Sequence, residues 1–306
     1  MIRSQCSNFF SIISLTLVIV LTSCSAGKFI PDNKYLLDKV EIKSDRKGFD
    51  AAQLAPYIRQ KANSKWFSLF KIPLGTYALS GKDSTKWINR TLQRIGEQPV
   101  LFDSAQARLS CEDLRIAMQN MGYMNARVSF NVKVRKKKNL DAIYTLSPGE
   151  PFYIKHFRYD IQDSVVACVL KPHISEKFIP RQFTVSSLDN ERSRLTAVLN
   201  DSGYYRFHKD FIQFDADSVR GSRDIDVTLH LLKYRQSSDS PEINHPRYMI
   251  GKVLFIPSDS TGLHLRRSVL ENSTAIESGR YYSSSALKRT YNNFARLGAV
   301  RYTNID

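Results

Sequence analysis

The sequence lacks the patterns that are typical of a catalytic or metal-binding site. Its six histidines are scattered without a His-x-x-x-His pair, and there is no Cys-x-x-Cys motif, no phosphate-binding loop and no nucleophile elbow. An extracytoplasmic hydrolase would need a nucleophile with a base in register, which the sequence does not provide. We therefore predict that the chain is not an enzyme and that it binds no metal ion and no cofactor.

Cysteine is scarce, with four among 306 residues. Cys6 and Cys24 fall in the N-terminal segment, whereas Cys111 and Cys168 fall in what we predict to be different domains. We therefore expect no disulfide bond, although an oxidising compartment would permit one.

Charge is almost absent from the first 23 residues, where Arg3 is the one charged side chain. An apolar run covers residues 9–21 and is too short to span a bilayer comfortably. A charged start, a short apolar run and small residues at the exit are typical of a secretory signal peptide. We therefore predict that residues 1–23 are a signal peptide and that the mature chain leaves the cytoplasm.

The signal ends in the segment 21–24, LTSC, which resembles the bacterial lipobox, where the signal is cut before the cysteine and the new N-terminus is acylated. We predict that Cys24 is the lipid attachment site. The alternative is an ordinary cysteine within a signal peptide. Stable anchoring needs more than one acyl chain. Ser25 stands where an aspartate often signals inner-membrane retention, so the resemblance favours the outer membrane.

Acidic residues are the minority, with 29 Asp and Glu against 45 Lys and Arg, which gives a formal net charge of +16. An exported protein does not meet nucleic acid, so the charge favours anionic lipid headgroups or acidic protein partners. The alternative is a solvated basic surface without a specific partner. The hydrophobic fraction of 42% is sufficient for packed cores.

Three amphipathic segments of one design repeat along the body of the chain. Each begins with a polar capping pattern, continues with an apolar stripe at helical spacing and ends at a glycine, which can adopt a positive φ. The capping patterns are Ser110 with Asp113, Ser186 with Asp189, and Ser283 to Ser285. The stripes are Leu114, Ala117, Met118 and Met121; Leu188, Leu195, Val198 and Leu199; and Leu287, Tyr291 and Phe294. The terminating glycines are Gly122, Gly203 and Gly298.

Strands surround these helices, because apolar and polar residues alternate with a period of two. Residues 128–134 and 143–146 predict a hairpin, and residues 225–231 predict the returning strand of a second one. Short opening strands are predicted at 40–42, 153–159 and 249–256, and a further helix at 52–62. Each unit therefore has the order strand, helix, helix, strand, strand, which predicts an α+β fold.

This order, repeated in tandem behind a membrane anchor, resembles the polypeptide-transport-associated (POTRA) domains, which form the periplasmic arm of outer-membrane assembly factors of the BamA and TamA type. The junction 148–160, PGEPFYIKHFRYD, and the Gly-Tyr pair after the second helix are the most telling residues. The resemblance covers residues 34–306, and with the lipobox the chain looks like the TamA-like lipoproteins of the Bacteroidetes. It implies an arrangement of POTRA-like β-α-α-β-β units, two complete and a third truncated.

The predicted organisation follows from these elements. It comprises a signal peptide (1–23), a lipidated linker (24–33), a first POTRA-like domain with an insertion (34–148), a second domain (149–235), a linker (236–246) and an incomplete third domain (247–306). In the family the arm leads into a β-barrel, and no barrel strands follow here. We expect either a fragment of a longer protein or a truncated gene product.

The resemblance implies that the strand after the second helix lies at a sheet edge, where an extended client can add by main-chain hydrogen bonds. This predicts client binding at residues 127–135 and 207–215. The predicted binding residues are Arg127, Val128, Phe130, Val132, Lys133, Arg135, Phe207, Phe211 and Phe214. The alternative is that these edges bind nothing and only space the domains.

The function that we predict is that of a lipid-anchored periplasmic module at the outer membrane, which binds outer-membrane barrel precursors or subunits of an assembly complex. The alternative is a structural scaffold that tethers or spaces envelope components.

Two further segments have open interpretations. The aromatic-rich stretch 65–77 either faces a partner or membrane or packs into the first domain's core, and Lys136 to Lys138 form either a docking site or a solvated turn.

Overall fold

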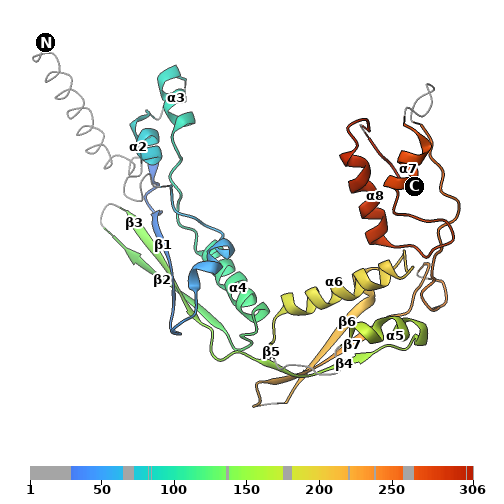
Figure 1. Ribbon diagram of the computed structural model, residues 1–306. Coiled ribbons are helices and arrows are strands. Elements are labelled where there is room, and N and C mark those ends of the chain that lie inside the picture. The colour runs from blue at the N-terminus through green and yellow to red at the C-terminus, as the bar shows by residue number, and fades with distance from the viewer. Residues whose placement is uncertain are drawn as a thin grey trace, which may run out of the picture. The chain divides into compact units, whose positions relative to one another are not determined.

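The structure is a computed structural model in which the chain divides into two compact units, Met1–Glu150 and Pro151–Asp306 (Figure 1). The fold is α+β, as predicted. The finer division at residues 236–246 stays a prediction. The structure describes residues 29–64, 72–81, 83, 85–135, 138–174, 181–219, 221–237, 239–257, 265–300 and 302–305. The signal peptide and Cys24 lie outside these residues, and so do residues 65–71, Lys136 and Lys137.

The first unit is built on a three-stranded sheet, with one long helix and a 3₁₀ helix packed on one face. Its elements are β1 (Leu36–Ser44), the 3₁₀ helix η3 (Ala51–Tyr57), α2 (Ile72–Leu79), α3 (Trp87–Ile95), α4 (Ser104–Asn120), β2 (Arg127–Val134) and β3 (Asn139–Ser147). The strand order is β1-β3-β2; β3 is parallel to β1 and antiparallel to β2. The central strand is therefore the last one in the chain, and the first two strands are the edges.

The core of the first unit lies between this sheet and α4. The predicted stripe on α4 is confirmed, because Leu114, Ala117 and Met118 are buried against Tyr144 and Leu146 of β3. The period of two in the hairpin places alternate residues of β2 and β3 on the same face, so the sheet supplies one continuous apolar layer to the helix.

The second unit repeats this arrangement. Its elements are β4 (Tyr153–Asp160), α5 (Ser164–Leu170), η4 (Lys171–His173), β5 (Arg181–Gln182), α6 (Val185–Asp201), η5 (Lys209–Phe211), β6 (Ile212–Ser218), β7 (Asp224–Leu231), α7 (Arg267–Ser273) and α8 (Ser284–Arg296). The strand order is β5-β4-β7-β6, in which β7 is parallel to β4 and antiparallel to β6. Leu195 and Leu199 of α6 are buried, which confirms the centre of the predicted stripe.

Two of the predicted helix starts are wrong. α4 begins six residues before Ser110, because the Asp103 carboxylate accepts the N–H of Ala105 and caps the helix there. Ser110 is buried inside the helix, where its hydroxyl donates to the carbonyl of Gln106. α6 begins two residues early, since Thr184 and not Ser186 caps it. The third start, at Ser283, is as predicted.

Two of the three glycine stops are confirmed. Gly122 has φ +94° and Gly203 has φ +103°, the left-handed region that glycine enters without steric cost. In both cases the next tyrosine donates its N–H back into the last turn: Tyr123 to Met118 at 3.0 Å and Tyr204 to Leu199 at 3.1 Å. Gly298 is not in this region, and α8 ends before it at Arg296.

Other local predictions are also corrected. The helix predicted at 52–62 is only the short η3, which contains Pro56. The opening strand predicted at 249–256 does not form; Met249 makes an isolated bridge to Tyr281, because no described residue after α8 supplies a strand to pair with it. Within the described residues, no helix combines the length and apolar character that crossing a bilayer requires.

The aromatic-rich stretch 65–77 is described from residue 72 onward. Leu74 is buried in a small cluster with Ile30, Leu36 and Ala78, which supports burial for this part of the stretch.

Candidate functional site: the β2 edge

The outer side of β2 presents backbone groups that the sheet does not use. The Arg135 N–H donates to the Asn139 carbonyl at 2.7 Å, which marks this position as a hydrogen-bonded pair. Counting back along the antiparallel register, the backbone N–H and C=O groups of residues 127, 129, 131 and 133 point toward β3. The N–H and C=O groups of the alternate residues point away from the sheet: Val128, Phe130, Val132 and Val134. No described residue hydrogen-bonds to them.

The side chains of β2 divide between two faces. Val128 and Phe130 pack against the core, but Val132 and Val134, farther along the same face, are 45% and 54% exposed. Lys133 lies on the opposite face, which is solvated. Just beyond the strand, the Arg135 guanidinium pairs with the buried Asp141 carboxylate at 2.6 Å. The edge therefore keeps a regular register, is partly apolar and carries basic side chains.

The other edge of the same sheet is protected. At its start, the N–H of Leu37 donates to Val100 and the N–H of Phe102 donates to Tyr35, both at 2.8 Å, so the chain before α4 covers the backbone. The register also shifts between Leu37 and Lys39, which breaks the regular edge. Covered backbone and an irregular register are devices that keep edges from pairing.

Charge adds to the protection of β1. Lys39 and Lys43 both pair with the Glu41 carboxylate, Lys43 at 3.0 Å, and their hydrogen bonds lower the pKa of Glu41 to about 2. A row of charged side chains disfavours the approach of another strand. The two edges of the first sheet therefore differ, and β2 is the one left open.

In the second unit β6 occupies the position of β2. The Leu232 N–H donates to the Phe211 carbonyl at 2.8 Å, so by register Ile212, Phe214, Ala216 and Ser218 direct their backbone groups outward. The solvated face of this edge is acidic, with Asp215 and Asp217, in contrast to the basic surroundings of β2.

The predicted start of the β6 edge at residue 207 is wrong. Phe207 is 2% exposed, and its N–H donates to Tyr204 in the turn after α6. Phe211 lies in η5, and both rings pack against His245. These two phenylalanines are core residues, so of the three predicted in this unit only Phe214 lies on the strand.

Sequence reasoning missed two histidine contacts on the solvated face of the second sheet. His156 hydrogen-bonds to Asp226 at 2.7 Å, and His230 lies between Asp160 at 2.8 Å and Asp215 at 3.2 Å. The parallel register of β4 and β7 places His156 opposite Asp226 and Asp160 opposite His230. Both contacts could therefore have been predicted if that register had been known. The contacts tie β7 to β4 and β6, the two strands beside it.

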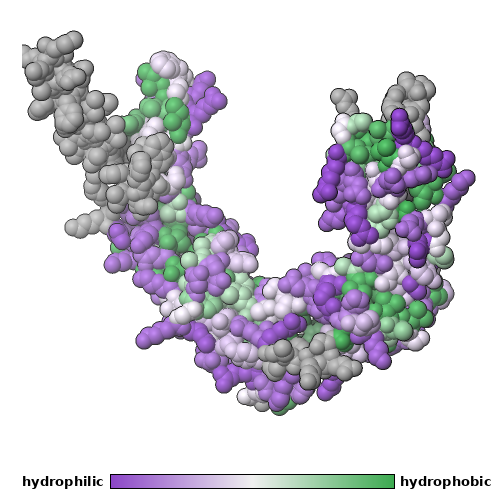
Figure 2. Space-filling view, in the orientation of Figure 1, coloured by the Kyte–Doolittle hydropathy of each residue, from purple (hydrophilic) through white to green (hydrophobic). Residues whose placement is uncertain are grey.

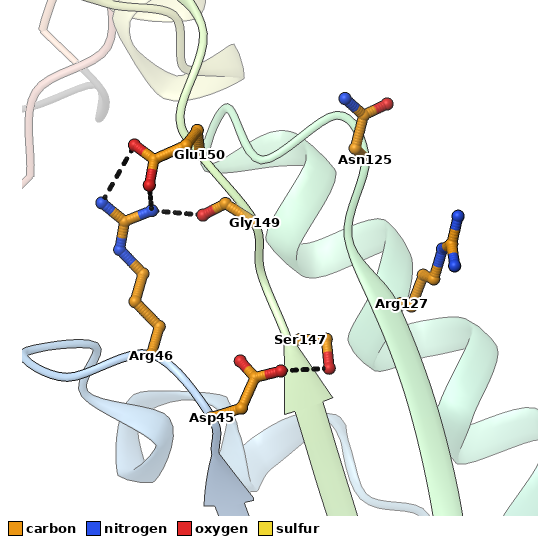
Figure 3. Close-up of a pocket in the computed structure, with 7 residues that line it drawn as sticks. All are labelled: Asp45, Arg46, Asn125, Arg127, Ser147, Gly149 and Glu150. Carbon is orange, nitrogen blue, oxygen red and sulfur yellow. Dashed lines mark hydrogen bonds and ion pairs between the residues drawn. The ribbon is translucent and has the colours of Figure 1, made fainter.

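A cavity of about 400 Å³ lies next to the start of β2 (Figure 3). Arg46 donates to the carbonyl of Gly149 and pairs with Glu150 at 3.3 Å, and the hydroxyl of Ser147 donates to Asp45 at 2.5 Å. Arg127, at the rim, has no ion-pair partner among the described residues (Figure 3). It therefore leaves an unneutralised cation at the first position of the open edge.

Neither a metal site nor a disulfide is found in the part of the chain that the structure describes. Cys111 is half-buried, and burial raises the pKa of its thiol; Cys168 is exposed.

No family model and no curated protein matches the chain. Among solved structures, the chain is similar to POTRA domains 3–5 of BamA from Haemophilus influenzae, with 14% identity and a TM-score of 0.42, covering 88% of this chain and 89% of that one. It is also similar to POTRA domains 1–3 of the periplasmic domain of Omp85 from Anabaena, with 6% identity and a TM-score of 0.31, covering 86% and 85%. A third similar structure is the N-terminal domain of Omp85 from Thermosynechococcus elongatus, with 9% identity and a TM-score of 0.28, covering 88% of each.

Proposed function

We propose that the chain is a POTRA-like, lipid-anchored periplasmic module of an outer-membrane protein assembly or translocation factor, and that it holds unfolded client polypeptides at the β2 edge. The observation that carries this proposal is the open row of outward backbone groups on Val128, Phe130, Val132 and Val134. The lipobox ending at Cys24 supports the anchor, and the order of strands and helices in both units supports the POTRA-like fold.

Main-chain capture suits a protein that handles many clients. A client strand that pairs with β2 bonds to backbone groups, which every sequence offers, so recognition is tolerant of sequence. β2 contributes one donor and one acceptor at each of the four outward residues, or about eight groups in total. This length suits a strand of an outer-membrane barrel, which is about nine to eleven residues long.

Magnitudes indicate that capture is weak and reversible. Each hydrogen bond contributes a net of about 1 kcal/mol, while ordering the client backbone costs about 1–2 kcal/mol per residue. Hydrogen bonds alone therefore do not offset the ordering cost. Apolar client side chains that pack on Val132 and Val134 add about 1.5–3 kcal/mol for each one fully buried. Clients with alternating apolar residues, as in barrel strands, are therefore favoured.

Site-specific crosslinking tests this proposal. A photoreactive amino acid at position 132 is expected to trap unfolded barrel precursors in cells. The matched control is the same amino acid at Lys43, an exposed position on the protected β1 edge, where no such adduct is expected. Adducts at position 132 with folded envelope proteins alone would contradict capture and would support the alternative function, a scaffold that spaces other components.

A further inference from the structure

The short helix α3 turns its polar side toward the protein. The Asn89 side chain accepts the N–H of Gly81 at 2.8 Å, and the Gln93 amide donates to the Gly81 carbonyl at 3.1 Å. Gly96 follows the helix so close to the backbone of Tyr77 that a Cβ would lie 2.4 Å from its nitrogen. Amide hydrogen bonds and one close backbone approach therefore fasten α3 to the chain at the end of α2.

The apolar side of α3 faces solvent. Trp87 is 73% exposed, Ile88 52% and Ile95 69%, and no residue of the helix is buried. At 100° per residue these three positions fall within one arc with Thr91 and Leu92, on the side away from Asn89 and Gln93. Figure 2 shows hydrophobic side chains gathered beside hydrophilic ones at the tip of the α2–α3 hairpin. A helix that packs on the core of a globular protein has the opposite polarity, because its apolar side faces the core and its polar side faces water.

All charge on this helix is positive. Lys86, Arg90 and Arg94 are exposed, and residues 86–96 include no Asp or Glu. None of the three has an ion-pair partner among the described residues. An outward apolar arc with aromatic and aliphatic side chains, next to unpaired basic residues, is typical of a helix that lies in the interface of an anionic membrane.

We propose that α3 lies on the surface of an anionic phospholipid bilayer, with Trp87, Ile88 and Ile95 in the interface and Arg90 and Arg94 at the headgroups. A lipid surface fits better than a protein groove, because the apolar arc can enter the membrane interface while the basic side chains beside it contact the anionic headgroups.

The position of the hairpin in the fold supports this assignment, through an argument that rests on the proposed anchor. Phe29 contacts the ring of Tyr77 with centroids 5.1 Å apart, and Ile30 packs on Leu74 and Ala78 of α2. Phe29 is five residues after Cys24. Five extended residues reach at most about 18 Å, so a lipid on Cys24 would hold this hairpin near the membrane.

Tryptophan fluorescence tests the proposal on the full chain. Trp66 and Trp87 are the two tryptophans, so Trp66→Phe leaves Trp87 as the sole fluorophore. The W66F chain is reconstituted into vesicles of phosphatidylethanolamine and phosphatidylglycerol with brominated acyl chains. We expect a blue-shifted emission and the loss of most Trp87 fluorescence to bromine quenching.

The controls separate the roles of charge and apolar surface. Replacing Arg90 and Arg94 by Gln in the W66F chain should reduce quenching to the level found with phosphatidylcholine vesicles. The same change at Lys47 and Lys61, also exposed in the first unit, should leave quenching unchanged.

Two results would overturn the proposal. A blue-shifted emission without bromine quenching would show that Trp87 is covered by protein, either a partner's groove or a second copy. An unshifted emission would show that it stays in water. Neither result depends on a client, so crosslinks at position 132 would still test capture separately.

Discussion

Two glycines in the second unit differ in the backbone conformation that they adopt, and this difference predicts opposite responses to one substitution. Gly203→Ala places a Cβ at φ +103°, 3.1 Å from the Tyr281 ring, and we expect a loss of about 1–2 kcal/mol in the free energy of unfolding. Gly298→Ala meets open space at an ordinary φ, so no loss is expected. Urea unfolding of both variants measures this, and equal losses would show that the αL stop after α6 is not required.

The Tyr159–Glu191–Arg194 cluster gives a pH-dependent prediction at the same scale. The Tyr159 hydroxyl donates to Glu191 at 2.9 Å, and Arg194 donates to it at 2.6 and 2.9 Å. Burial alone would raise the pKa of Glu191, but the hydrogen bonds from Arg194 and Tyr159 hold it below its usual 4.5. Burial and the Glu191 charge raise the pKa of Tyr159 to about 12.

Because folding lowers the pKa of Glu191, its contribution is present above pH 4.5 and is lost as the pH falls through the lowered pKa. We therefore expect Glu191→Gln to lower the free energy of unfolding by about 1.5–3 kcal/mol at pH 7 and by much less at pH 3. Urea unfolding at both pH values measures the difference. A loss of the same size at both would mean that the carboxylate charge does not stabilise the fold.

At the scale of the element, the register of β2 predicts which proline the strand tolerates. The N–H of Val132 points outward, so Val132→Pro removes a donor for a client and no bond of the sheet. Lys133→Pro instead removes a bond to β3, and we expect a larger loss of stability. Thermal unfolding and crosslinking from position 134 check both effects. Val132→Pro should keep the fold and lose client adducts, and retained adducts would count against edge pairing.

The elements also show what the sequence determines locally. The alternation over residues 128–134 predicted β2, because its period of two is that of a strand and the polar turn after it marks where the strand ends. Ser110 misled the prediction of α4, since a capping pattern inside a helix looks the same in sequence as one at its start, and the tertiary bond from the Arg59 N–H to Ser110 is not visible there. α3 was not predicted, because its polarity is reversed and the sequence alone does not show which side meets the protein.

At the scale of the whole molecule, each unit has its own core. The fold class was predictable because the repeat of helix patterns and strand alternation determines it. The absence of the third opening strand, at 249–256, was not predictable, since a strand there depends on pairing partners elsewhere in the chain. The open edge of β2 and the protected edge of β1 became distinguishable only with the backbone contacts of residues 100–102.

The two cores predict two unfolding transitions. Leu114→Ala should lower only the transition of the first unit and Leu195→Ala only that of the second, each by about 2–5 kcal/mol, because both side chains are fully buried in different clusters. Differential scanning calorimetry of the full chain resolves the two. A single transition that both variants shift equally would contradict separate cooperative units.

Amide hydrogen exchange along β2 tests the central claim most directly. The probe is a synthetic ten-residue peptide with alternating apolar and polar residues, like one barrel strand. On its addition, the amides of Val128, Phe130, Val132 and Val134 should exchange more slowly, while the amides between them, already bonded to β3, should change little. Unchanged exchange at the four outward amides under saturating peptide would contradict the account.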